Sequence, residues 1–305
     1  MLNYFIRRLL GAIPTLFTII AVSFMLVHAA PGGPFDKERK VPASVEAKLI
    51  EKYHLDEPLP QQFARYIGDL MQGDFGPSFK YPDRSVSELI AAGFPTSLLL
   101  GSCAISLALL LGVFLGIWAA LRQNSWIDYL CVGSAMLGIA IPNYVFAPLM
   151  TLVFGLLLGW LPVNGWGEPR HMVLPILALA IPQVAAITRL TRASMLEVLG
   201  SNFVRTARAK GLPEAVTLTR HAIRAAMLPV VSYLGPAVAY VVTGSVIIEE
   251  IFRIPGIGRY FVLGAINRDY TMVLGVTVVF GALIILCNLI ADLCYGLLDP
   301  KVRYD

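Results

Sequence analysis

Charged residues are scarce in this sequence. Only 14% of its 305 residues are Asp, Glu, Lys or Arg, whereas 57% are hydrophobic and the mean hydropathy is +0.70. Soluble domains carry about a quarter of their residues as charged side chains, because these cover the surface that faces water. The composition therefore excludes an ordinary soluble domain, and we expect lipid to cover much of this protein.

Cysteine and histidine are also rare, with four residues of each. The cysteines lie in or beside apolar stretches and form no C-x-x-C pair: Cys103, Cys131, Cys287 and Cys294. We therefore expect packed thiols rather than a disulfide or a zinc site. The histidines are scattered, without an H-E-x-x-H motif: His28, His54, His171 and His221. The sequence thus predicts no metal site and no catalytic residues, which disfavours a membrane enzyme.

A nucleotide-binding motif is missing as well. The chain has no G-x-x-x-x-G-K-[ST] sequence, and no lysine follows a glycine anywhere in it. A P-loop requires that lysine, together with a glycine-rich turn, to hold phosphates. We therefore expect this chain to bind no cofactor itself, so that any energy from ATP comes through a partner.

Long apolar runs are what the sequence has instead. Six are long enough, at about 20 residues, to cross about 30 Å of hydrocarbon. The predicted spans are 9–30, 95–121, 129–158, 172–188, 229–251 and 272–297. Pro142 and Pro148 predict an interfacial turn inside the third, and the fourth is short and interrupted by Pro175 and Pro182. The sequence therefore predicts an all-α membrane protein with six transmembrane helices and a single domain, 1–305.

Loop charges predict the orientation of these spans. The segments assigned to the inside are 1–8, 122–128, 189–228 and 299–305, and they hold 12 Lys and Arg against 5 Asp and Glu. The short outer segments hold only 4 Lys and Arg, if the long segment 31–94 is left out. We therefore expect both termini to be cytoplasmic.

Two polar insertions interrupt the apolar pattern. In the outer one, 31–94, Phe63, Ile67 and Leu70 share a helical face, and Ser85 with Glu88 forms a capping-box pattern. This insertion is expected to be a small helical lid on the outer membrane surface. The inner one, 189–228, is strongly basic and has helical patterns on both sides of a glycine.

The inner insertion contains a basic turn: Arg205, Thr206, Ala207, Arg208, Ala209, Lys210, Gly211, Leu212 and Pro213. Its pattern predicts a helix that stops at Gly211 and a second helix that restarts at Pro213, a favoured first-turn residue. On composition alone, an ordinary positive-inside loop would explain the charges.

The order of these residues resembles the cytoplasmic loop motif of ABC importer permeases, in the variant of dipeptide and oligopeptide permeases. That motif reads Glu-Ala-Ala, three residues, Gly, nine residues, Ile-x-Leu-Pro. Residues 205–207 occupy the first positions and Gly211 has the right spacing, whereas 221–224 make the second half degenerate. Segments 9–16, 250–258 and 267–270 are also similar to these permeases, and 73–81 is similar to the oligopeptide subtype in particular.

The resemblance implies a type I ABC importer permease fold and the first of two permease subunits, in the bacterial inner membrane. The implied partners are a second homologous permease, two ATP-binding subunits that carry ATP and Mg, an extracytoplasmic peptide-binding protein and the lipid bilayer, with no nucleic acid. The loop 189–228 would couple to an ATPase groove, with Arg208 as a contact charge that does not shape the turn. Dipeptides, glutathione and nickel chelates remain alternative substrates.

Polar residues inside the predicted spans are few. Candidates for lining a translocation path, and equally for bonding a neighbouring helix, are Asn143, Gln183, Tyr240, Thr243 and Asn288. The acid well inside a span is Asp292, and we expect a basic residue of the inner loop as its partner. It lies off-centre, which disfavours an ion-coupled secondary transporter, because such transporters need ionisable groups near the midplane.

Glycines in the spans are spaced for helix packing. Gly112 and Gly116 in the second span, and Gly235 with Ala239 in the fifth, form small-xxx-small patterns. Such patterns let two helix backbones approach closely. We therefore expect these positions to be helix contacts rather than ligand sites.

Overall fold

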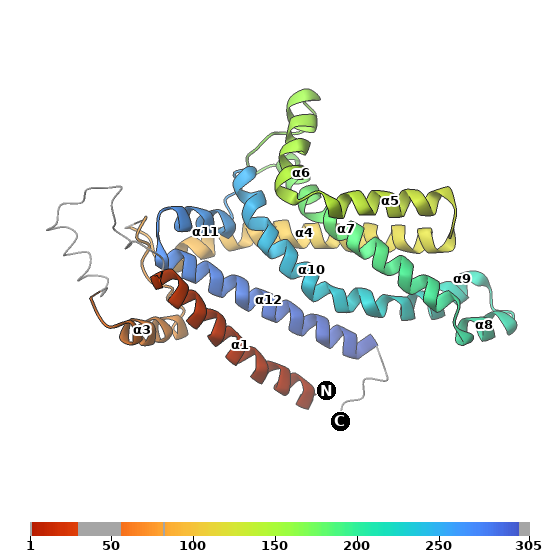
Figure 1. Ribbon diagram of the computed structural model, residues 1–305, viewed down its shortest axis with the longest axis horizontal. Coiled ribbons are helices and arrows are strands. Elements are labelled where there is room, and N and C mark those ends of the chain that lie inside the picture. The colour runs from red at the N-terminus through yellow and green to blue at the C-terminus, as the bar shows by residue number, and fades with distance from the viewer. Residues whose placement is uncertain (1, 30–55, 82, 299–305) are drawn as a thin grey trace. The chain divides into compact units, whose positions relative to one another are not determined.

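The computed structural model describes residues 2–29, 56–81 and 83–298, which form helices joined by short connections (Figure 1). The elements are α1 (Leu2–Ala29), α3 (Leu59–Met71), α4 (Val86–Leu121), α5 (Trp126–Ala140), α6 (Asn143–Met150), the π-helical η1 (Thr151–Leu157), α7 (Pro169–Leu199), α8 (Asn202–Ala209), α9 (Glu214–Val216), the π-helical η2 (Thr217–Ala222), α10 (Ile223–Ile251), α11 (Ile257–Ile266) and α12 (Tyr270–Leu298). Over these ranges the only β-structure is an isolated bridge between Pro77 and Ser85. The predicted all-α class is confirmed.

Five helices in the described ranges are long and apolar enough to cross a membrane, and a bent pair raises the number to six. The bent pair replaces the predicted third span: α5 and the run Asn143–Leu157 meet at 105°. The break falls at Pro142, and Ile141 before it is extended, at φ −95° and ψ 117°. A residue that precedes proline avoids the helical region, so the turn predicted there is confirmed, whereas Pro148 lies inside α6.

The described residues divide into two compact units. The first comprises 2–9, 98–254 and 284–298, and the second comprises 10–29, 56–81, 83–97 and 255–283. Helices α1, α4 and α12 contribute residues to both units, so no linker separates them. The single domain expected from the sequence stays a prediction.

Helix α7 is central to the first unit, where it contacts α5, α6 and α10. The close packing of α7 against α4 depends on two glycines of α4. A Cβ added to Gly112 would lie 2.7 Å from Cβ of Ile187, and one added to Gly116 would lie 2.5 Å from Cβ of Thr191. Real Cβ atoms do not approach so closely, so the predicted packing role of these two glycines is confirmed.

Helices extend into the predicted inner insertion, 189–228, from both sides, and its bounds stay a prediction. Helix α7 continues through Pro175 and Pro182 to Leu199, and the helical run that includes α10 begins at Glu214. Hydropathy measures how much of a helix lies in hydrocarbon, whereas hydrogen bonding lets the helix continue into the polar region. The polar connection between these two long helices is therefore α8 with its flanking turns.

In the second unit, α3 packs through its apolar face. Phe63, Ile67 and Leu70 lie in a cluster with Ile20 of α1 and Leu274 of α12, as their spacing predicted. Before α4, the Ser85 hydroxyl accepts the Glu88 N–H at 3.1 Å and the Glu88 carboxylate accepts the Ser85 N–H at 3.2 Å. The predicted capping box is confirmed. Residues 30–55 of the predicted outer insertion lie outside the described residues.

Candidate functional site

The basic turn ends α8 in a glycine cap. Gly211 has φ +74°, its N–H bonds the Arg208 carbonyl at 2.9 Å, and the Leu212 N–H bonds the Ala207 carbonyl at 3.3 Å. These two bonds define a Schellman motif with glycine in the left-handed position. Pro213 then precedes α9 as its N-cap rather than as its first helical residue. The predicted stop at Gly211 is confirmed, and the predicted restart is one residue early.

An ion pair closes the turn. Arg208 donates to both carboxylate oxygens of Glu214, from Nη2 at 2.6 Å and from Nε at 3.1 Å. The hydrogen-bonded Glu214 carboxylate raises the pKa of Arg208. Both side chains are about half exposed, at 43% and 54%. The pair joins α8 to α9, so Arg208 does more than present a contact charge, and its contact with an ATPase stays a prediction.

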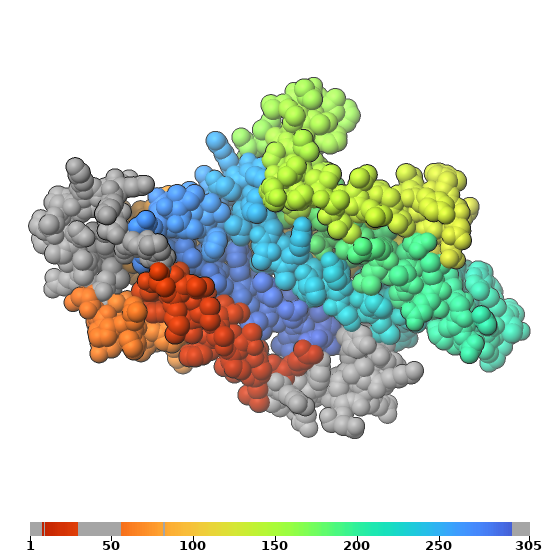
Figure 2. All heavy atoms as spheres, in the orientation of Figure 1, coloured from red at the N-terminus to blue at the C-terminus, as the bar shows by residue number. Residues whose placement is uncertain are grey.

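The turn is anchored on one side and open on the other. Val204 and Ala207 are buried, and Val204 lies in a cluster with Met195 of α7 and Ala226 of α10. The other residues of the predicted coupling segment are exposed, namely Arg205, Thr206, Arg208, Ala209, Lys210, Gly211, Leu212 and Pro213. In Figure 2 this teal segment protrudes from the surface. The arrangement forms an exposed basic projection on a buried base.

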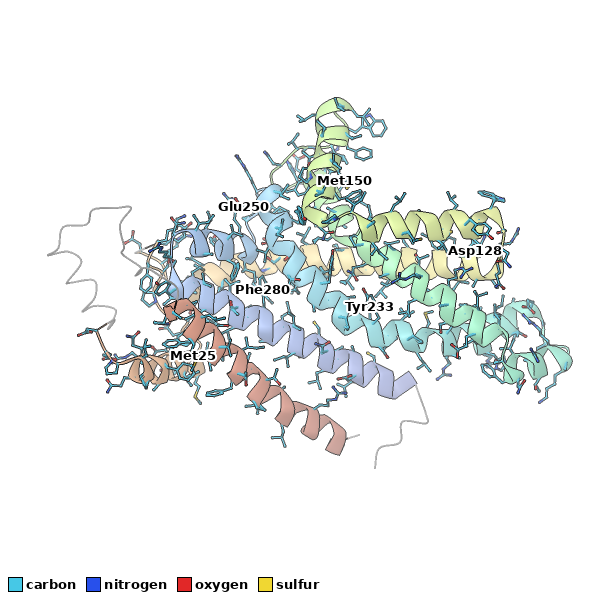
Figure 3. All side chains as sticks on the ribbon, viewed as in Figure 1. Met25, Asp128, Met150, Tyr233, Glu250 and Phe280 are labelled. Atoms are coloured by element: carbon cyan, nitrogen blue, oxygen red, sulfur yellow. The ribbon has the colours of Figure 1, made fainter. Side chains whose placement is uncertain are left out.

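A buried ion pair that the sequence did not predict lies near the same end of α7. Asp128 at the start of α5 is 2% exposed and receives Nε of Arg192 at 2.5 Å and Nη2 at 2.7 Å. The other Asp128 interactions hold the preceding loop, because Oδ2 accepts the N–H of Asn124, a residue with φ +61°. Figure 3 labels Asp128, which lies in the first turn of α5. The S-x-x-D pattern from Ser125 signalled the cap, but nothing local signalled the arginine.

The candidate path residues are divided among separate contacts. The Tyr240 hydroxyl donates to Oδ1 of Asn143 at 3.3 Å, so two of the candidates meet. Gln183 instead accepts from Tyr233, labelled in Figure 3, at 3.1 Å. The Thr243 hydroxyl bonds the backbone of its own helix at 3.0 Å and 3.1 Å. These bonds connect α10 to α6 and α7, and their use in a path stays a prediction.

Asn288 and Asp292 lie on α12. A Cβ on Gly235 of α10 would clash with Oδ1 of Asn288, so this glycine is a helix contact, as predicted. Asp292 pairs with Nη1 of Arg8 at 2.7 Å. The expected basic partner is present, but it is a residue of α1 and not of the inner loop. In the predicted orientation, the start of α1 and the end of α12 both lie on the cytoplasmic side. Among the described residues, no group of three or more His, Cys, Asp or Glu is placed to hold a metal.

Comparisons with known proteins cover the whole chain. Residues 112–304 match the family described as binding-protein-dependent transport system inner membrane component, and residues 1–101 match its N-terminal family. The chain is 51% identical over 306 residues to the oligopeptide transport system permease protein OppB of Haemophilus influenzae, and equally to that of Escherichia coli, covering 100% of each chain. It is 43% identical to the dipeptide transport system permease protein DppB of Bacillus subtilis, covering 99% of this chain and 98% of that one.

A solved structure shares the fold. It is described as the crystal structure of an amino acid ABC transporter with histidines, and it matches with a TM-score of 0.53 at 17% identity. The match covers 71% of this chain and 95% of the other. At this identity the similarity concerns the fold alone.

Proposed function

This chain belongs to the family of binding-protein-dependent transport system inner membrane components, and on that basis we propose that it is the permease subunit of an ATP-driven importer of oligopeptides. Membership places the chain in the inner membrane, as a transporter component and not an enzyme, within a complex that has other subunits. The observation that carries the oligopeptide assignment is 51% identity over the full length of two oligopeptide permeases. The dipeptide permease at 43% supports dipeptides as the second candidate.

The partners we propose are a second homologous permease, two ATP-binding subunits and an extracytoplasmic peptide-binding protein. ATP and Mg belong to the ATP-binding subunits, since this chain has no P-loop. The basic turn supports the contact with one of them. Arg205 and Lys210, together with the Arg208–Glu214 ion pair, surround an exposed Schellman turn on a buried base, so a groove with acidic walls would receive it without a change of shape.

A movement of this turn would be transmitted directly to the two long helices on either side of it. The turn is joined on one side by α8 to the end of α7, and on the other side it opens into the helical run Glu214–Ile251. Both long helices also carry the polar side chains Gln183 and Tyr233 that bond each other. Closure of the ATP-binding subunits would therefore move α7 and the run that includes α10, which are packed against each other.

Reconstitution tests the proposed function. The purified chain should hydrolyse no ATP, because it lacks a P-loop. Proteoliposomes that contain both permeases and both ATP-binding subunits should take up labelled oligopeptide when the binding protein and ATP are supplied. Uptake of dipeptide but not oligopeptide would select the second candidate, and uptake by the lone chain in an ion gradient would contradict the proposal.

Cysteine labelling tests the orientation. Asn164 and Ala209 are exposed residues in the connections on the predicted outer and inner sides. Asn164 is preferable to its neighbour Gly165, which has φ +114° and would bring a Cβ within 2.9 Å of His171. In a cysteine-free background, Asn164→Cys should react with an impermeant maleimide on spheroplasts, and Ala209→Cys should react only after lysis. The reverse pattern would invert the topology.

A further inference from the structure

The second unit contains a cavity that the coupling function does not use. Its volume is about 180 Å³, and it lies among the last turn of α1, helix α3, the segment 76–79 and the first turn of α12. In Figure 2, α3 is the orange surface beside the red one of α1. By the predicted orientation this is the outer end of both helices. A volume of this size corresponds to about six water molecules at about 30 Å³ each.

An unpartnered hydroxyl belongs to one of the residues that line this cavity. Tyr66 of α3 lines it, is only 8% exposed, and its buried hydroxyl bonds to none of the residues that the structure describes. Burial raises the pKa of Tyr66 well above its ordinary value, so the phenol stays neutral and keeps both a proton and lone pairs. A buried hydroxyl without a hydrogen bond is unfavourable, so a polar group that reached it from the cavity would stabilise it.

The charges at the cavity favour a cation. Glu57 and Arg65 compensate each other in an ion pair of 2.5 Å. Asp69, one turn after Arg65, also lines the cavity, and within the described part of the chain its carboxylate has no ion-pair partner. The Asp69 carboxylate is therefore an acceptor at the cavity wall, whereas His28, which also lines the cavity, already donates to the Phe24 carbonyl at 2.8 Å.

Aromatic rings complete the surroundings of a cation. Phe24, Phe79 and Tyr270 line the cavity, and the Phe79 and Tyr270 rings meet edge to face with centroids 6.4 Å apart. Ring faces attract ammonium groups, and a carboxylate and a hydroxyl can accept their protons. A carboxylate ligand would instead meet the charge of Asp69.

We propose that this cavity receives the side chain of a lysine from the extracytoplasmic binding protein. The inference rests on the proposed function, and it identifies the chemistry of one docking contact. A lysine side chain has five non-hydrogen atoms, which fits a volume of about six waters. The planar guanidinium of an arginine carries five donors, more than the Asp69 carboxylate and the Tyr66 hydroxyl can accept in place of the three of an ammonium. The ammonium would bond Asp69 and Tyr66 while its methylenes lie against the rings.

Binding of the purified binding protein to the complete complex in nanodiscs tests this. Asp69→Asn should raise the dissociation constant about tenfold, since it leaves a buried ammonium without its counter-charge. Tyr66→Phe removes one hydroxyl and should raise it by about three- to tenfold. Asp83→Asn is the matched control, because Asp83 is an exposed acid of the same unit outside the cavity, and it should have no effect.

Chemical modification of the lysines of the binding protein tests the other side of the proposed contact. Acetylation of its lysines should weaken binding to the wild-type complex and have little further effect on Asp69→Asn, whereas dimethylation, which keeps the charge, should be tolerated better. An unchanged dissociation constant for Asp69→Asn would overturn the inference and leave the proposed function standing. A raised KM for free peptide with unchanged docking would also overturn it, and would assign the cavity to the peptide ammonium. Failure of the wild-type complex to bind any binding protein would overturn both.

Discussion

Gly211→Val is expected to reduce peptide uptake by about tenfold or more, while the permease still reaches the membrane and still assembles with the second permease. Gly211 has φ +74°, and no atom lies within 4 Å of the position of an added Cβ. The change therefore creates no steric clash, and its cost of about 1–3 kcal/mol comes from holding a β-branched residue in the left-handed region. A turn that is populated less often in its docking shape binds its partner correspondingly less. Uptake of labelled peptide, with the complex quantified by blot, measures this.

Gly200 and Arg205 provide the controls. Gly200 lies at the other end of α8 with φ −81° and only ordinary contacts, so Gly200→Val should be mild. Arg205→Glu reverses an exposed charge without breaking the Arg208–Glu214 ion pair, and it should also impair uptake if the turn docks by charge. Arg208→Glu combines both effects, because two carboxylates would then face each other. Near-normal uptake by Gly211→Val and Arg205→Glu together would contradict the coupling assignment.

Asp128→Ala should destabilise the permease by about 3–5 kcal/mol, because it leaves a largely buried arginine without its counter-ion. Asp128 is 2% exposed and also accepts the N–H of Asn124, so the loop before α5 loses its anchor in the same variant. The midpoint of thermal unfolding in detergent should fall, and less complex should be recovered from membranes.

The double variant Asp128→Ala with Arg192→Leu is the matched control. Removing both charges abolishes the desolvation problem, so much of the lost stability should return. If Asp128→Ala alone has the unfolding midpoint of the wild type, the ion pair does not stabilise this unit. If the double variant is as unstable as the single one, the anchoring of Asn124 is the dominant contribution instead.

Features with a local signal could be predicted from the sequence. The capping box at Ser85 and Glu88, the glycine stop at Gly211 and the break near Pro142 each depend on neighbouring residues, and all three occur. Helix length was underestimated for the opposite reason. Apolar composition identifies only the part of a helix that lies in lipid, so the predicted fourth span ended at residue 188, whereas α7 continues to Leu199.

Contacts between distant residues could not be predicted. Asp128 and Arg192 are 64 positions apart, and their sequence contains no sign that α5 and α7 bring them together. Asp292 needed a basic partner, but several arginines satisfied that need, and only helix packing selects Arg8. For the same reason, Asn143 and Tyr240 were each predicted as candidates for lining the path, but nothing in the sequence indicated that they form a hydrogen bond with each other.

The helical run from Glu214 to Ile251 has mechanical consequences. At about 1.5 Å per residue its 38 residues extend over about 57 Å, which is longer than the hydrocarbon layer. A helix of this length can act as a lever, and it bends most easily where the regular backbone hydrogen bonds are interrupted. Those places are the π-helical η2 and the two prolines of α10, Pro229 and Pro236, which remove the helical donors of the Ala225 and Ser232 carbonyls. A force on the basic turn is therefore expected to bend this helical run at these positions and to move the segment after Pro236 as a rigid body.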